Sequence, residues 1–328
     1  MPLTIVILGV IVALFALVPP AQYPLGIDPA SVSLSTRTPI PTAQPAPTDV
    51  HGGRIVFTCA REGVNQICEI GADGSGYTQL TVGDSNKYYP AVSRDGTKIV
   101  YAENLYDLFD LYLLDLDPGK GAGSGRWRRT KLTDTIGNAF SPSFSPDASE
   151  VAFANRTGPG PASIWIVRSN GEDPHPIYTP PRDIGGLAWS PDGSLLAFTM
   201  ASDLKFAYEI YLLDPKHPGQ APSQVSHGLP AMGGSVSWSP NQADLLIFAG
   251  PAAARQIFRL ELGSGRTSQL TFGGNNASPA YSPDGLHIVF NSVRSGSQAD
   301  LYIMRADGHS MRQLTQDPEP DWQPQWGG

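Results

Sequence analysis

A five-residue phrase recurs along this chain about every 45 residues, and it constrains the fold more than any other feature. One copy reads Trp189-Ser190-Pro191-Asp192-Gly193, and a shortened copy, Trp326-Gly327-Gly328, lies at the end of the sequence. The other copies begin at Val92, Phe144, Trp238 and Tyr281. Self-similarity at this period indicates one supersecondary unit stacked many times, because a single unit of this size cannot bury its own apolar face.

Each unit is predicted to form four short β-strands. The phrase is followed by an apolar run such as Leu195–Phe198, then by a polar-to-apolar step such as Glu209–Tyr211, and the unit ends in a pair such as Leu270-Thr271. These runs are rich in β-branched and aromatic residues and are bounded by Gly, Pro and Asp, which is typical of strands. In the Ser-Pro-Asp-Gly step, Pro presets φ for a tight turn and Gly takes the positive φ that closes a hairpin. No apolar stretch in the repeats has a helical period, so the fold is predicted to be all-β.

The two ends of the array predict how many units there are. Residues 52–81 match strands two, three and four of a unit but lack strand one, and residues 324–326 match a strand one with nothing after it. The two fragments add up to one unit. We therefore expect residues 52–328 to form a six-bladed β-propeller of four-stranded blades, closed by the C-terminal strand completing the first blade. Closure leaves only short, protected sheet edges.

Large and small side chains alternate along the predicted strand one of each blade. The large set is Val92, Phe144, Trp189, Trp238, Tyr281 and Trp326. The small set is Ala91, Ser143, Ala188, Ser237, Ala280 and Gln325. Large residues of one blade should pack on small residues of the next and fill the wedge between them, which makes Trp326 the residue that closes the ring.

The repeat resembles the WD40-like propeller repeat of the TolB family. The resemblance covers about residues 52–328 and rests on Pro-x-Trp-Ser-Pro-Asp-Gly, an Ile-Ala-Phe-like run, Asp-Ile-Tyr and Leu-Thr. It implies a periplasmic protein that binds an envelope partner, as TolB binds a peptidoglycan-associated lipoprotein through its propeller. The residues ahead of the repeats do not resemble the α/β domain that precedes the TolB propeller. Similar blades also form the non-catalytic half of prolyl-oligopeptidase-like enzymes.

The N-terminal residues differ in composition from the repeats. Residues 1–18 contain an uncharged apolar segment, residues 3–18, which we interpret as a retained membrane tether; a cleaved signal peptide is the alternative. Residues 19–51 are rich in Pro and Thr and are expected to be a linker. Cys59 and Cys68, the only cysteines, fall on strands two and three of the first unit as directly opposed residues, so a disulfide is predicted. A disulfide fits an extracytoplasmic protein, periplasmic or at the cell surface.

The sequence contains no pattern for catalysis or for metal binding. There is no Gly-x-Ser-x-Gly, His-Glu-x-x-His, Cys-x-x-Cys or P-loop motif, and the six histidines are scattered. The positions predicted for strand one carry no Asp, Glu or His, which argues against a metal in the channel. The net charge of −8 argues against nucleic acid as a partner. We therefore expect no cofactor and no catalytic residue.

Binding is the better interpretation. The loops that link strand four to the next strand one, and strand two to strand three, should lie on one rim of a monomeric ring. They carry the aromatic residues Tyr88, Tyr89, Tyr106, Phe109, Phe206 and Tyr208. Clustered exposed aromatic side chains are typical of a recognition surface, so this rim is predicted to bind an envelope protein or a cell-wall glycan. The alternatives are that part of these side chains fold back onto the propeller, and that Asp84, Asp134, Asp183 and Asp203 serve a hydrolase or lyase acting on sugar or peptide polymers.

Overall fold

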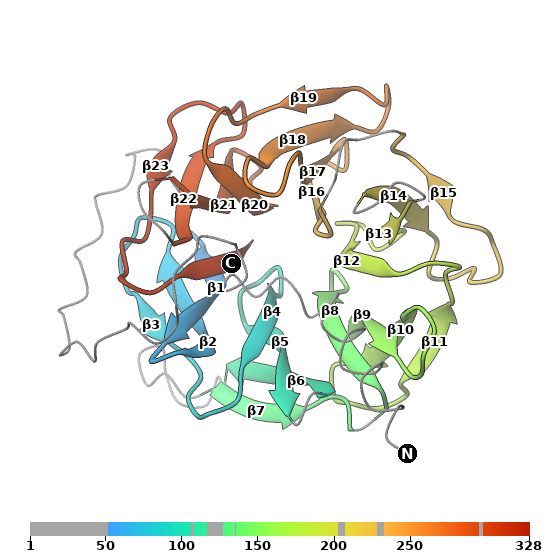
Figure 1. Cartoon of the computed structure of the whole chain (residues 1–328). Coiled ribbons are helices and arrows are strands. Elements are labelled where there is room, and N and C mark those ends of the chain that lie inside the picture. Colours follow the sequence, from blue (N-terminus) through green and yellow to red (C-terminus); the bar gives the residue numbers. More distant parts are fainter. Residues whose placement is uncertain are drawn as a thin grey trace, which may run out of the picture.

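The computed structural model describes residues 52–105, 108–116, 127–134, 136–202, 207–227, 233–294 and 298–328. These residues form six antiparallel sheets of four strands each, arranged radially around a centre (Figure 1). The described residues contain no helix. The prediction of an all-β, six-bladed β-propeller is therefore confirmed.

The strands of each blade are numbered along the chain, and strand one is the innermost. Blade 1 consists of β24 (Asp321–Gly327), β1 (Arg54–Arg61), β2 (Val64–Gly71) and β3 (Thr78–Gln79). Blade 2 consists of β4 (Lys87–Val92), β5 (Lys98–Leu105), β6 (Leu108–Leu116) and β7 (Trp127–Lys131). Blade 3 consists of β8 (Asn138–Phe144), β9 (Glu150–Arg156), β10 (Ser163–Arg168) and β11 (His175–Tyr178).

The other three blades repeat this order. Blade 4 consists of β12 (Ile184–Trp189), β13 (Leu196–Ala201), β14 (Tyr208–Leu213) and β15 (Ser223–Gln224). Blade 5 consists of β16 (Ser237–Trp238), β17 (Asp244–Ala249), β18 (Gln256–Glu261) and β19 (Thr267–Gln269). Blade 6 consists of β20 (Asn275–Tyr281), β21 (His287–Val293), β22 (Asp300–Arg305) and β23 (Arg312–Gln313).

The ring is closed by the pairing of the last strand with the first. β24 runs antiparallel to β1, with Trp326 opposite Ile55 and Trp322 opposite Thr58. In Figure 1 the red C-terminal strand lies beside the blue β1. The C-terminal strand thus completes blade 1, as the split repeat predicts.

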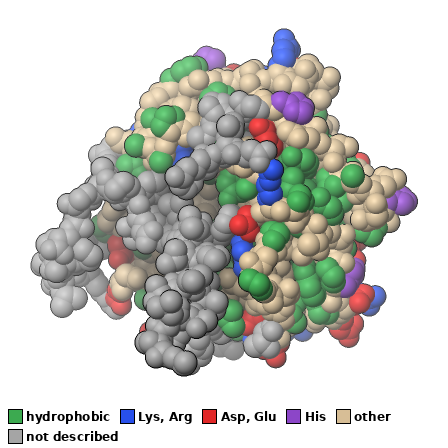
Figure 2. Space-filling view, turned by 45° about the vertical axis from the view of Figure 1, so that its right-hand side comes forward, with side chains coloured by type: hydrophobic (Ala, Val, Ile, Leu, Met, Phe, Trp, Pro, Cys, Tyr) green, Lys and Arg blue, Asp and Glu red, His purple; other side chains and the backbone are tan. Residues whose placement is uncertain are grey.

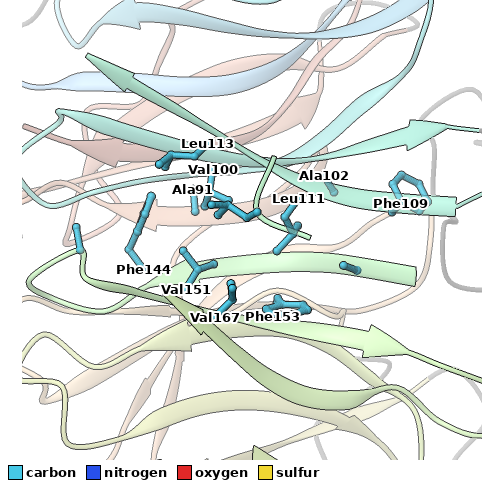
Figure 3. Packing of buried hydrophobic residues seen from close by; sticks show 13 residues of the cluster. Ala91, Val100, Ala102, Phe109, Leu111, Leu113, Phe144, Val151, Phe153 and Val167 are labelled. Atoms are coloured by element: carbon cyan, nitrogen blue, oxygen red, sulfur yellow. The ribbon is translucent and has the colours of Figure 1, made fainter. Parts of the chain in front are cut away.

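The wedge between neighbouring blades is filled by the alternation of large and small residues. Phe144 of blade 3 shares a core cluster with Ala91 of blade 2, and Figure 3 shows this cluster between the two sheets. Trp326 of blade 1 packs in the same way in the cluster that contains Ala280 of blade 6. In these pairs the small partner belongs to the preceding blade rather than to the next one, so the expected direction of packing was wrong. Trp326 is only 9% exposed, as expected of a closing residue.

The Ser-Pro-Asp-Gly turn is held by its own side chains. In blade 4 the Ser190 hydroxyl donates to Asp192 Oδ1 at 2.7 Å, and Asp192 Oδ1 accepts the amide of Ser194 at 2.9 Å. Gly193 follows with φ of 73°, which favours glycine. These hydrogen bonds lower the pKa of Asp192 to about 2. The serine and aspartate of the repeat are therefore parts of a turn, not of a catalytic site.

A β-bulge interrupts strand one ahead of its proline in several blades. Tyr89, Ser141, Ser278 and Gln323 each have φ between 50° and 54°, and the register shifts at this point in each strand. The sequence-based alternation of faces therefore holds only after the bulge. Before it, strand one carries side chains that the alternation did not predict.

Candidate functional site

Two rims and a central channel are the surfaces on which a site could lie. We define the link rim as the one formed by the links from strand four to the next strand one and by the hairpins between strands two and three. The turn rim, at the other end of the channel, carries the Ser-Pro-Asp-Gly turns. Strand-one residues of all six blades enclose a cavity of about 220 Å³ between the rims. Among its described lining residues only Arg94 carries a charge, and apolar and aromatic side chains such as Trp189 form much of the wall.

Of the aromatic residues predicted for the link rim, Phe109 is buried, and Tyr88 and Tyr89 are half-buried against it and its neighbours. Phe109 is 3% exposed and lies at one end of the cluster between blades 2 and 3 (Figure 3). The rings of Tyr88 and Phe109 are 5.8 Å apart, and those of Tyr89 and Phe140 are 6.5 Å apart. Asn65 Nδ2 donates to the Tyr88 hydroxyl at 2.7 Å. These residues therefore form a packed support beneath the rim, and burial raises the pKa of Tyr89 far above its usual range.

The remaining predicted rim residues do not join this group in one exposed surface. Tyr208 is half-buried in blade 4, where burial, and to a smaller extent the charge of Asp183, raises its pKa to about 12. Tyr106 and Phe206 lie outside the described residues. The alternative that part of the aromatic side chains fold back onto the propeller thus holds for Phe109 and Tyr89.

Sequence reasoning missed the apolar side chains that the link rim does expose. Val82 is 81% exposed and Phe272 is 76% exposed, and Leu108 at the start of β6 is 48% exposed. Val82 and Phe272 occupy the same position in the repeat, directly after Leu80-Thr81 and Leu270-Thr271. An alignment of the repeats could have revealed them, because most other units have a polar residue at this position. The residues there are Asp134, Pro180, His227 and Gln316.

The Leu-Thr pair forms a latch at the link rim. In blade 1 the Thr81 hydroxyl accepts the amide of Ile67 at 2.8 Å and donates to Gln66 Oε1 at 2.9 Å. Blade 2 repeats this with Thr133, which donates to Asp110 Oδ1 at 2.9 Å. The same hydroxyl-to-side-chain bond links Ser226 to Glu209 and Thr271 to Gln256, and in blade 3 Ser163 bonds Thr179. The polar residue near the start of strand three is therefore structural in these five blades.

A buried charged cluster lies where blade 6 meets blade 1. Asp321 opens β24 with a fully buried side chain, and Arg61 lies 2.9 Å from Asp317 and 3.7 Å from Asp321. Lys87 opens β4 in the same way, at 2% exposure. The expectation that strand one lacks acidic residues was therefore wrong, because the strands begin before the bulge, further upstream than the repeat indicated.

The structure joins Cys59 and Cys68 in a disulfide, with an S–S distance of 1.95 Å and a Cα–Cα distance of 5.9 Å. The two residues are not directly opposed, however. Cys59 pairs with Gln66 and Cys68 pairs with Phe57, so the cysteines are diagonal neighbours on the β1–β2 hairpin. Both cysteines are fully buried.

The loop carboxylates of the enzyme hypothesis do not converge within the described residues. Asp183 is paired with Arg156 at 2.7 Å, and Asp134 is paired with Lys131. Asp203 lies outside the described residues. In the part of the chain that the structure describes, no three His, Cys, Asp or Glu side chains are placed so that together they could hold a metal ion. On the face seen in Figure 2, acidic, basic and histidine side chains are dispersed among apolar and neutral atoms.

The structure does not test the predicted membrane tether. Residues 3–18 lie outside the described residues. Within the described ranges, no helix has the length and apolar character needed to cross a membrane.

Comparison with curated sequences finds partial relatives. An uncharacterized protein of Agrobacterium fabrum is 34% identical over 137 residues, which are 41% of this chain and 44% of that protein. The Tol-Pal system protein TolB of Anaeromyxobacter dehalogenans is 32% identical over 92 residues, which are 28% of this chain and 21% of TolB. The matched region thus spans less than half the length of these relatives. No family model matches the chain.

Solved structures share the fold at low identity. TolB from Acinetobacter baumannii superposes with a TM-score of 0.69 at 20% identity, covering 84% of this chain and 66% of TolB. An oligogalacturonate lyase in complex with manganese superposes with a TM-score of 0.55 at 16% identity, covering 81% of this chain and 74% of the lyase. The chain is therefore a six-bladed β-propeller that is similar to TolB in fold and, over part of its length, in sequence.

Proposed function

We propose that this protein is an extracytoplasmic interaction module and that its link rim binds a protein partner at the cell envelope. The observation that carries the proposal is the exposure of large apolar side chains on this rim. Val82, Phe272 and Leu108 are among the four exposed large hydrophobic residues of the described chain, and the fourth, Leu286, lies on the turn rim. Interfaces draw much of their binding energy from a few such residues that become buried in the complex.

The buried aromatic group beneath the rim supports this proposal. Tyr88, Tyr89, Phe109 and Phe140 pack against one another and against the core clusters of blades 2 to 4. A rim held by packed rings loses little conformational freedom when a partner binds, which favours affinity. Three of the predicted contact residues, Tyr88, Tyr89 and Phe109, therefore become part of the platform, and Val82, Leu108 and Phe272 become the proposed contacts.

The location rests on the TolB relatives and on the sequence. A disulfide between Cys59 and Cys68 fits an oxidising compartment. The apolar segment of residues 3–18 is proposed to tether the protein, and residues 19–51 to act as the spacer between membrane and propeller. In this arrangement the propeller is a monomer that reaches partners near the membrane surface.

The test is crosslinking of the full chain on intact cells, followed by mass spectrometry. The double variant Val82→Ser and Phe272→Ser should lose at least about tenfold of the crosslinked partner, which corresponds to about 1.4 kcal/mol. Leu286→Ser is the matched control, because Leu286 is 57% exposed on the opposite rim. Equal crosslinking by all three proteins would reject the link rim as the binding surface. A glycan recovered in place of a protein would reject the class of partner but keep the surface.

A hydrolase or lyase acting on sugar or peptide polymers is the alternative function. It draws on the lyase among the structural neighbours, a likeness that concerns the fold alone. Asp134 and Asp183 are each held by a basic side chain, so neither is poised as a free acid or base. Depolymerisation of polygalacturonate by the full chain, lost on Asp183→Asn, would favour this alternative.

A further inference from the structure

Blade 6 departs from the latch found in the other blades. The residue that opens its third strand is Asp300, and the residue that ends the unit is Thr315, whose hydroxyl accepts the amide of Leu301 at 3.0 Å. Asp300 Oδ2 accepts a hydrogen bond from Gln313 at 2.9 Å, but Asp300 Oδ1 has no hydrogen-bond partner. Asp300 is only 7% exposed. A buried carboxylate oxygen without a donor destabilises the ionised form of the acid.

The neighbouring strand adds a second buried acid that has too few hydrogen-bond donors. Asp321, the first residue of β24, is 0% exposed, and the Thr315 hydroxyl faces its carboxylate without a close hydrogen bond to either oxygen. Its Cα pairs with that of Cys59 in β1, so it lies directly on the seam that closes the ring. Its backbone amide is bound to the carbonyl of Ala299 in blade 6 at 2.8 Å.

Three carboxylates gather at this seam, and one cation, Arg61, pairs with two of them. Arg61 of β1 lies 2.9 Å from Asp317 Oδ2, in the link between blades 6 and 1, and 3.7 Å from Asp321 Oδ1. Asp300 approaches from β22, and the Thr315 hydroxyl also faces Asp321. Glu319, in the same link, accepts the amide of Glu62 at 3.1 Å. With all three aspartates ionised, the cluster would hold two more negative charges than positive ones in a buried place, which proteins avoid unless protons or cations bind.

The balance of these contacts favours bound protons. Burial raises the pKa of Asp321 well above its usual value, and Asp317 and Asp300 add to this, while Arg61 acts in the opposite direction. Burial, together with the charge of Asp317, raises the pKa of Asp300 to about 6. At the position equivalent to Asp321, blade 6 has Asn276, a neutral amide whose Nδ2 donates to Gln256, Thr271 and Gly273. The repeat itself therefore accommodates an uncharged polar side chain at this site.

We propose that the seam between blades 6 and 1 is a proton-dependent closure, in which protonated Asp321 and Asp300 hold the C-terminal strand in the ring. Each acid binds its proton more tightly in the folded chain than in the unfolded chain. The stability that it contributes is fully present below the unfolded pKa of about 4. It is lost as the pH rises through the folded value. The window therefore runs from about pH 4 to above pH 6, and the pairing of β24 with β1 loosens as the protons leave.

The test compares the full chain with Asp321→Asn in thermal unfolding at pH 5, 6.5 and 8. The melting temperature of the wild type should fall by about 5 °C between pH 5 and pH 8. Asp321→Asn should remove at least half of this fall and should raise the melting temperature at pH 8. Hydrogen exchange of the β24 amides, corrected for the intrinsic effect of pH, should show faster opening at pH 8 in the wild type only.

Asp110→Asn is the matched control, because Asp110 occupies the latch position of blade 2 as Asp300 does in blade 6, but has Lys131 3.1 Å away. This control should keep the pH dependence of the wild type. Equal pH dependence in the wild type and Asp321→Asn, or its loss in Asp110→Asn, would overturn the proposal. If millimolar Ca²⁺ restores the melting temperature of the wild type at pH 8 to its value at pH 5, a metal ion rather than a proton neutralises the cluster. That result would also overturn the proposal. If Asp321→Asn does not fold, Asp300→Asn provides the same comparison.

Discussion

Blades 6, 1 and 2 differ from blades 3, 4 and 5 in the residue that is buried at the start of strand one. In every unit the fifth residue before the large residue of strand one is buried. At the interfaces around blades 6, 1 and 2 it is polar: Asn276, Asp321 and Lys87. At the interfaces around blades 3, 4 and 5 it is apolar or small: Ala139, Ile184 and Gly233. The same backbone position thus accepts both kinds of residue when each is given matching neighbours.

The difference lies in what the position contacts. Lys87 Nζ donates to the carbonyls of Ser85 at 2.6 Å and Val82 at 3.3 Å, so it ties strand one to the link before it. Ile184 instead packs in a cluster with Phe140 and Leu187. The stability of the polar half should depend on pH, because its buried Asp321 and Lys87 can gain or lose a proton. The apolar half should respond only to changes in side-chain volume.

The largest effect is expected in the polar half, from removal of residues 321–328, which contain the closing strand of blade 1. The deletion removes β24, with Trp322 and Trp326 at 5% and 9% exposure, and leaves an unpaired edge on β1. Loss of one packed Trp alone costs about 3–5 kcal/mol. The shortened chain should therefore lose its cooperative unfolding transition in circular dichroism. A melting temperature equal to that of the full chain would contradict closure by β24.

A smaller effect is expected in the apolar half. Ile184 is 0% exposed, and Ile184→Ala should destabilise the protein by about 2–5 kcal/mol, because a cavity replaces the lost contacts. Since no titrating group is involved, the loss should be the same at pH 5 and pH 8. Urea unfolding at both values measures it. A loss that varies with pH would break the comparison between the halves.

The smallest effect is expected for Lys87→Met in the polar half. Burial lowers the pKa of Lys87, Arg129 lowers it further and Glu103 opposes the shift. The folded chain therefore releases this proton more readily than the unfolded chain, and stability should rise as the pH increases through the lowered value towards 10.5. Lys87→Met should lack this rise between pH 7 and 9.5 in urea unfolding. Parallel curves for the two proteins would show that Lys87 does not titrate in this range.

The fold could be predicted because each blade repeats the same local sequence pattern of turn and strand residues. The turn residues of Trp189–Gly193 and the unpaired strand one near Trp326 suffice for the blade count and for the closure. The exposure of single side chains was not predictable in this way. Phe109 and Val82 both lie in rim segments, yet one is 3% and the other 81% exposed, because exposure depends on which neighbouring blade lies opposite.

The seam cluster escaped prediction for a related reason. Asp300 matches the latch position of the other blades, and only the three-dimensional neighbourhood distinguishes it from Asp110. The latch gives Asp110 both a hydroxyl and Lys131, whereas Asp300 faces Asp317. Charge partners drawn from distant parts of the chain leave no local pattern in a sequence.

Closure by the last strand also has a consequence for the order of folding. Thr58 and Gln323 are hydrogen-bonded across 265 residues of sequence, whereas the strands within blades 2 to 6 pair with close neighbours. Bringing such distant segments together costs about 5 kcal/mol of chain entropy by the logarithmic dependence on loop length. During synthesis, blade 1 must therefore wait as a three-stranded sheet until the five other blades have formed and residue 327 has been made. Blade 1, whose strands β1 to β3 are made before the other blades, is then the last blade to reach its final structure.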